Sequence, residues 1–281
     1  MKKLITSLAL CVGLYSFAQE LPQPSPAASI KQRIGLTDIQ VDYSRPSLKG
    51  RKVFGELVPY GKMWRTGANK ATTIEFSTDV MMNKIPVAAG KYSIFTIPSE
   101  KSWIVILNRN ADLSGTNGYE KGQDVLRTDV AVKMGGMFES FTVEFENLTA
   151  DGAHLALKWE NRMVAIPIKV EVDKIAQENI EKAMKEDAEN WRVHRGAASY
   201  YIGKEMHYDK ALTYIDKSIE LKEDNWYNYW LRAEALNGLN RREDAIASAN
   251  KAIAMGEEQA KADGKEFTYG EGFKADMKTW K

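Results

Sequence analysis

The stretch from Tyr43 to Asn69 holds residue types that could bind a ligand. It reads YSRPSLKGRKVFGELVPYGKMWRTGAN, is rich in glycine, proline and basic residues, and has Glu56 as its one acidic residue. Arginine recognises carboxylate or phosphate groups through its planar fork, and tyrosine and tryptophan rings stack on flat or sugar-like ligands. The candidate ligand-binding residues are therefore Arg45, Arg51, Tyr60, Trp64, Arg65 and Asn69.

The same stretch also fits a purely structural crossover between strands. On that interpretation Trp64 fills the core, and Arg65 pairs with Glu56 or with backbone carbonyl groups. A loop this long in a compact domain is usually functional or disordered, and its regular apolar residues indicate an ordered one. The sequence leaves both interpretations open.

Patterns typical of catalysis are sparse. The only histidines are His154, His194 and His207, and none lies in the basic stretch. No His-Glu-x-x-His pattern or clustered metal-ligand spacing occurs, so no catalytic residue, metal or cofactor is predicted. Gly115–Gly118 is predicted to be a turn, because it does not open a helix after a strand as a phosphate-binding loop does. A binding role is favoured over an enzymatic one, with a carboxylate-dependent hydrolase left as an alternative because Asp and Glu are numerous.

The charge and length of the chain limit its class. Its 281 residues suit about two domains. Lys and Arg total 39 against 38 Asp and Glu, so no overall charge attracts the chain to nucleic acid, and no nucleic-acid partner is expected.

Residues 30–172 carry the two-residue alternation of half-buried strands. It is clear in 37–43, 71–77, 91–97, 138–145 and 154–159, with turn signals such as Asp151-Gly152 between strands. The predicted fold of this part is an all-β antiparallel sandwich, and an antiparallel barrel is the rival.

Residues 173–281 carry a helical period and an internal repeat. Ala211 and Ala245 are 34 residues apart, as are Ser218 and Ala252, which is the period of the tetratricopeptide repeat. An all-α helical repeat domain with two such repeats and capping helices is therefore predicted. The first helices, 191–203 and 225–239, would line a groove for a protein or peptide partner, with Arg195, Asn228 and Arg232 as groove candidates.

The N-terminus has the layout of a secretory signal. Two lysines precede an apolar run, and small residues stand at positions −3 and −1 of a cut after Ala18. Residues 1–18 are predicted to be a signal peptide and 19–29 a proline-rich linker, with no transmembrane segment in the mature chain. The expected location is the periplasm or cell envelope of a Gram-negative bacterium, and cleavage would remove Cys11, the single cysteine.

Several motifs of the β part resemble one bacterial family. They are VDYSRPS at 41–47, LVPYGK at 57–62, WRTGAN at 64–69 and AGKYSIFTIP at 89–98. Together they are similar to the domain of unknown function 2911 (DUF2911), over roughly residues 27–170. The resemblance implies an exported protein, sometimes with helical repeats attached, and it implies no assigned activity or catalytic residue.

These observations favour an exported, non-catalytic binding or scaffold protein that contacts a protein partner through its helical repeats. The first alternative is a β-sandwich that binds an anionic sugar or a peptide through the basic stretch. The second is the carboxylate-dependent hydrolase.

Overall fold

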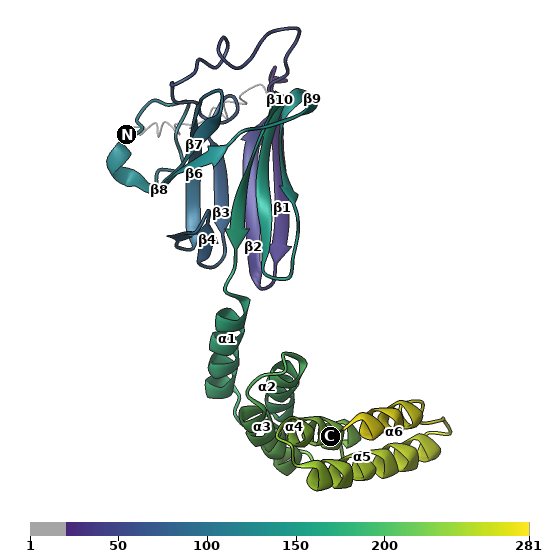
Figure 1. Ribbon diagram of the computed structural model, residues 1–281. Coiled ribbons are helices and arrows are strands. Elements are labelled where there is room, and N and C mark those ends of the chain that lie inside the picture. Colours follow the sequence, from purple (N-terminus) through teal and green to yellow (C-terminus); the bar gives the residue numbers. More distant parts are fainter. Residues whose placement is uncertain (1–20, 281) are drawn as a thin grey trace, which may run out of the picture. The chain divides into compact units, whose positions relative to one another are not determined.

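The computed structural model describes residues 21–280, which form two compact units divided between Val172 and Asp173. The first unit consists of antiparallel strands and the second of six helices, which confirms the predicted fold class (Figure 1). The predicted signal peptide, residues 1–18, lies outside the described residues. Within 21–280, no helix has the length and apolar character needed to cross a membrane.

The β unit contains two separate antiparallel sheets, and so a sandwich rather than a closed barrel. The six-stranded sheet has the order β1 (Ala27–Ile34), β2 (Thr37–Ser44), β3 (Thr72–Phe76), β6 (Gly90–Pro98), β7 (Ser102–Asn108) and β8 (Asp124–Ala131). The four-stranded sheet has the order β5 (Ile85–Val87), β4 (Val80–Met82), β10 (Gly152–Lys169) and β9 (Lys133–Glu146). A short 3₁₀ helix, Lys121–Gln123, precedes β8.

The core of the β unit joins both sheets through aromatic side chains. Trp103 of β7 and Trp159 of β10 are almost completely buried, and the ring of Phe54, from the segment between β2 and β3, lies 4.9 Å and 6.4 Å from them. The alternation in the sequence accounts for this arrangement, because every second side chain of a strand faces the same side of its sheet.

Several strands lie outside the alternating segments of the sequence, and two of them differ from it in an informative way. β1 begins at Ala27 and pairs with β2 from there onward, so the last residues of the predicted 19–29 linker are part of the sheet. The sequence does not single out β8, in which only Leu126 and Val130 are buried and the other side chains are partly or fully exposed. An edge strand with so few buried positions has a weak alternation.

The helical unit contains α1 (Val172–Glu186), α2 (Trp191–Gly203), α3 (Tyr208–Leu221), α4 (Trp226–Gly238), α5 (Arg242–Ala262) and α6 (Gly270–Thr279). The side chains of Asn190 and Asn225 accept hydrogen bonds from the first turns of α2 and α4 and so cap them. The helices α2 and α4 coincide with the two predicted first helices.

Small residues allow close packing within each helix pair. Ala211, Ser218, Ala245 and Ala252 are all fully buried. At the far end of the unit, the Phe273 ring of α6 stacks on Trp230 of α4 at a centroid distance of 3.6 Å. The helix α6 therefore covers apolar surface that the α4–α5 pair would otherwise expose.

Glycine at position 238 gives a test of this close packing. A Cβ atom there would lie 2.4 Å from the Tyr208 ring, whereas a Cβ at Gly196 of α2 would meet no atom within 4 Å. We expect Gly238→Ala to destabilise the helical unit by about 1–3 kcal/mol. Gly196→Ala should stabilise it by about 0.5–1 kcal/mol, since alanine restricts the unfolded chain and favours helix. Denaturant unfolding followed by far-UV circular dichroism measures both, and stabilisation by both variants would contradict the packing.

Candidate functional site

The crossover between β2 and β3 is anchored by Trp64. Its backbone N–H donates to Thr96 O at 2.7 Å and its carbonyl accepts from Thr96 N at 2.9 Å, so the segment adds a short bridge to β6. The indole ring lies in the core, stacked on Trp159 at a centroid distance of 5.7 Å, and its N–H donates to Gly67 O at 3.0 Å. Because side chains alternate along extended backbone, Met63 and Arg65 point to the opposite side from the indole. There Met63 packs against the buried cluster that contains Phe95 and Ile106, and Arg65 is half-buried.

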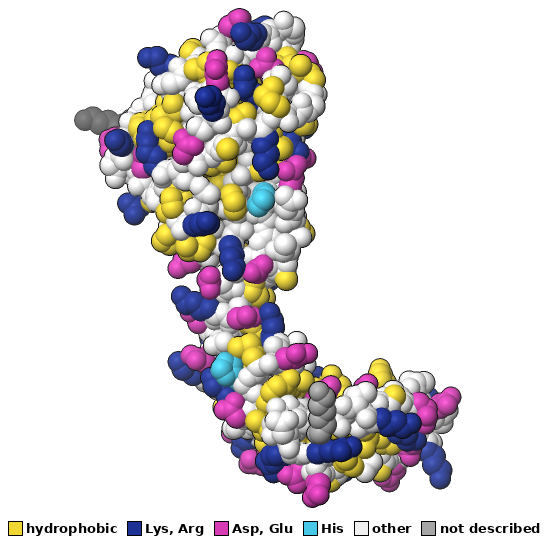
Figure 2. Space-filling view, in the orientation of Figure 1, with side chains coloured by type: hydrophobic (Ala, Val, Ile, Leu, Met, Phe, Trp, Pro, Cys, Tyr) yellow, Lys and Arg dark blue, Asp and Glu magenta, His cyan; other side chains and the backbone are white. Residues whose placement is uncertain are grey.

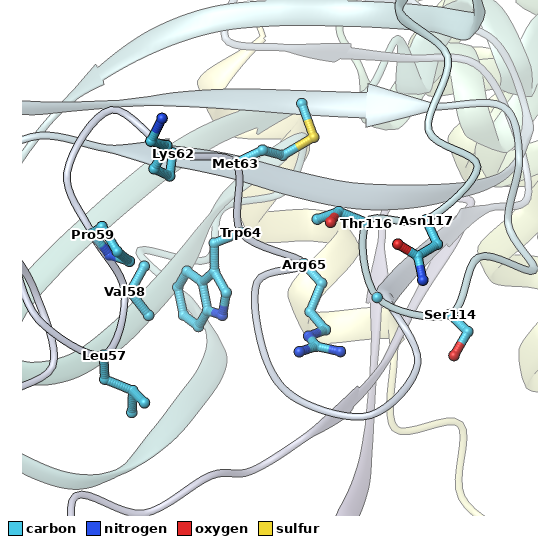
Figure 3. A pocket seen from close by; sticks show the side chains of 11 residues that line it. Leu57, Val58, Pro59, Lys62, Met63, Trp64, Arg65, Ser114, Thr116 and Asn117 are labelled. Atoms are coloured by element: carbon cyan, nitrogen blue, oxygen red, sulfur yellow. The ribbon is translucent and has the colours of Figure 1, made fainter.

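A cavity of about 430 Å³ opens beside this segment. Figure 3 shows Leu57, Val58 and Pro59 on one side of Trp64 and a polar group on the other. The full lining is Leu57, Val58, Pro59, Lys62, Met63, Trp64, Arg65, Ser114, Gly115, Thr116 and Asn117. A cavity of this size lies within the range of small-molecule sites.

The lining of the cavity is cationic. It includes Lys62, which is exposed, and Arg65, which is half-buried, but no Asp or Glu. Arg65 Nη1 donates to Asn69 O at 3.1 Å. Within residues 21–280 that is the only hydrogen bond of its guanidinium, and neither cation takes part in an ion pair. Glu56, the one acidic residue of the segment, pairs with Lys52 at 3.8 Å.

The polar wall of the cavity is a turn at Ser114–Gly118, held by two anchors. At its start, Leu113 is buried against Phe95 and Ile106, and its carbonyl accepts from Ala71 N at 3.0 Å. Gly115 allows the guanidinium of Arg65 to approach, because a Cβ there would lie 3.1 Å from Nη1.

The second anchor of this turn is the carboxylate of Asp124, at the start of β8. It accepts hydrogen bonds from Asn108 at 2.9 Å, from Tyr119 at 2.7 Å and from Arg127 at 3.0 Å. Burial, followed by the bond to Asp124, raises the pKa of Tyr119. The phenol therefore stays protonated at neutral pH and continues to donate to the carboxylate.

The other predicted ligand residues of the segment hold the crossover itself. Arg45 donates to Phe141 O at 3.2 Å and to Thr142 Oγ1 at 2.9 Å. Arg51 donates to two carbonyls, Leu48 O at 2.9 Å and Ser47 O at 2.8 Å. Both guanidinium groups therefore bond to the protein itself, through three backbone carbonyls and the Thr142 hydroxyl.

Asn69 and Tyr60 also make contacts within the protein. The Asn69 amide donates to Ser25 O at 3.1 Å and to Ser44 Oγ at 3.2 Å. The Tyr60 ring lies 5.9 Å from the Arg162 guanidinium. Of the six candidates, the structure therefore places only Trp64 and Arg65 in the lining of the cavity.

Sequence reasoning missed Lys62, Leu57 and the wall at 114–117 as parts of one site. Lys62 was one basic residue among several in the stretch, and Gly115–Gly118 is the turn that was predicted. The two glycines of this polar turn were the feature of the sequence that could have marked it as part of a site. Nothing in the sequence placed that turn opposite Arg65.

The predicted groove residues of the helical unit have different surroundings. Arg195 of α2 lies 4.8 Å from the Trp191 ring and 6.0 Å from the Tyr227 ring, so it joins α2 to α4 by cation–π contacts. Arg232 is paired with Asp216 at 2.7 Å. Asn228 is fully buried, with its amide nitrogen 3.5 Å from Lys222 O, and so presents no surface to a partner.

The cluster of charges around Lys158 does not have the properties of an acid–base site. Lys158 lies between Glu144 and Glu146 and bonds to both; the bond from Lys158 lowers the pKa of Glu146, whereas a general acid needs a raised pKa. Within the part of the chain that is described, no three His, Cys, Asp or Glu residues form a group that could hold a metal ion. Figure 2 shows basic and acidic side chains interspersed over the visible face.

Comparison with known proteins identifies the β unit only. No curated protein and no solved structure matches the chain. A family model described as "Protein of unknown function (DUF2911)" matches residues 25–168. The match runs from just before β1 almost to the end of β10, includes every residue that lines the cavity, and stops before α1. The chain belongs to the DUF2911 family.

Proposed function

We propose that this chain is an exported binding protein and that its β unit binds a small anionic ligand, a sugar acid or a peptide carboxylate. The observation that carries the proposal is the cavity at Lys62 and Arg65, which holds two cations and no carboxylate. Arg65 uses one of its five N–H donors on Asn69. The remaining donors suit a bidentate oxyanion, and hydrogen bonds to charged groups contribute about 1.5–3 kcal/mol each.

Substitution of Arg65, one of the two cations that line the cavity, tests this function. Arg65→Gln should weaken binding of glucuronate or N-acetyl-leucine by about tenfold or more, because it removes the charge-assisted hydrogen bonds. Isothermal titration calorimetry measures the affinity. The matched control is Lys52→Gln, which removes a cation of the same segment that is paired with Glu56 outside the lining. Equal loss in both variants, or no binding of either anion to the unaltered chain, would contradict the proposal.

Export is supported by the N-terminal pattern of basic start, apolar run and small residues before Gln19. N-terminal sequencing of the protein from its native cells should give Gln19 as the first residue, in the periplasmic or envelope fraction. Recovery of the chain from the cytosolic fraction with residues 1–18 retained would exclude export.

A second candidate function is protein binding by the helical unit through tetratricopeptide-like repeats. The repeat spacing and the buried small residues of α3 and α5 support that assignment. On α2, Arg192 and Arg195 lie over the Trp191 ring at 4.5 Å and 4.8 Å. Burial raises the pKa of Glu234, on α4, to about 7, so this carboxylate is only partly charged at neutral pH. The pair of arginines favours a partner with an acidic segment.

An acidic peptide tests this second surface. Fluorescence anisotropy should show a glutamate-rich peptide binding the chain, more weakly as salt rises, because exposed charges are screened. Arg195→Gln should lower the affinity several-fold. The control Arg242→Gln removes an exposed arginine of α5 and should leave the affinity unchanged. Equal affinities for both variants would remove Arg195 from the binding surface.

A further inference from the structure

The two sides of the cavity differ in polarity. On one side lie Leu57, Val58 and Pro59, whose side chains carry no hydrogen-bonding group. On the other lie Arg65 and the turn with Ser114, Thr116 and Asn117 (Figure 3). A ligand that touches both sides meets charge at one end and hydrocarbon at the other.

The apolar side is a rigid support. Val58 N donates to Val53 O at 2.9 Å and Gly55 N donates to Val58 O at 3.0 Å, which closes a tight turn. The Phe54 ring beneath this turn is buried in the core. The turn holds Leu57 at the cavity with 45% of its surface exposed. An exposed leucine fixed in this way can gain hydrophobic burial from a ligand without a further loss of backbone freedom.

We propose that the ligand is an organic acid with an apolar chain: its carboxylate lies at Arg65, and its chain lies along Leu57, Val58 and Pro59. This inference rests on the proposed anion binding and specifies the ligand class within it. The carboxylate completes the hydrogen bonding of the Arg65 fork, and the chain covers the exposed part of Leu57.

Neither a bare oxyanion nor a sugar acid makes full use of such a site. A phosphate ion would leave Leu57 and most of the 430 Å³ in water. A sugar acid would place hydroxyl groups against Leu57 and Pro59, where no side chain replaces their hydrogen bonds to water, and unsatisfied polar groups disfavour binding.

Two sources share the chemistry of the proposed ligand: a fatty acid, and a peptide or N-acyl amino acid with an apolar side chain at its carboxylate end. Octanoate and N-acetyl-leucine represent them. Acetate and glucuronate have the charge without the apolar chain, and octanol has the chain without the charge.

The experiment compares these five probes by isothermal titration calorimetry on the full chain. We expect octanoate or N-acetyl-leucine to bind at least tenfold more tightly than acetate, glucuronate or octanol, and the tighter of the two identifies the source. Leu57→Ser should weaken that probe about tenfold and leave acetate unchanged, since acetate does not reach Leu57. Leu148→Ser, which alters another exposed leucine outside the cavity, is the matched control and should change neither affinity.

The outcomes separate this inference from the function on which it rests. Equal affinities for octanoate, acetate and glucuronate, each reduced by Arg65→Gln, would overturn the apolar-chain ligand and leave anion binding in place. Octanoate affinity that is unaffected by Leu57→Ser would also overturn it. Absence of binding by every acid probe would overturn both proposals. Because Leu57 is largely exposed, Leu57→Ser should fold, and its unchanged acetate affinity verifies this in the same titration.

Discussion

The packing of the Trp64 ring against Trp159 is the interaction on which the candidate site depends. It inserts the crossover segment into the core between the sheets, and removal of a buried tryptophan ring costs about 3–5 kcal/mol. The two backbone bonds to Thr96 fix the register. With the ring inside, Arg65 must lie outside, and so the same residue pair that completes the core also places a cation at the cavity.

The turn after Arg65 shows the strain that accompanies this placement. Thr66 is fully buried with φ of 54°, a left-handed conformation that a β-branched residue rarely adopts. Its hydroxyl bonds to Thr96 Oγ1 at 3.2 Å, and its carbonyl accepts from the Thr72 hydroxyl. These bonds hold the chain in a reversal sharp enough to bring Asn69 O back to the Arg65 guanidinium.

Local patterns in the sequence predicted the elements well and the site only in part. Alternation located β2, β3 and β6, and the 34-residue repeat located α2 to α5, because each depends on neighbours in the chain. Trp64 and Arg65 could be identified as candidate site residues because the composition of one segment is also a local property of the sequence. The partners that distinguish a structural arginine from a free one are distant: Phe141 O, which occupies Arg45, is 96 residues away along the chain. No local pattern contains that information.

The arginines of this segment differ in the groups to which they bond. One basic stretch can therefore both hold the crossover and place a cation at the cavity. Arg45 and Arg51 each donate two hydrogen bonds to groups of the β unit and so stabilise the crossover, and neither lines the cavity. Arg65 donates one, and the single carboxylate nearby in sequence, Glu56, is engaged by Lys52. The scarcity of acidic residues therefore has a physical consequence: a carboxylate close to Arg65 would satisfy its fork within the protein, whereas without one the remaining donors stay available to the ligand that we propose.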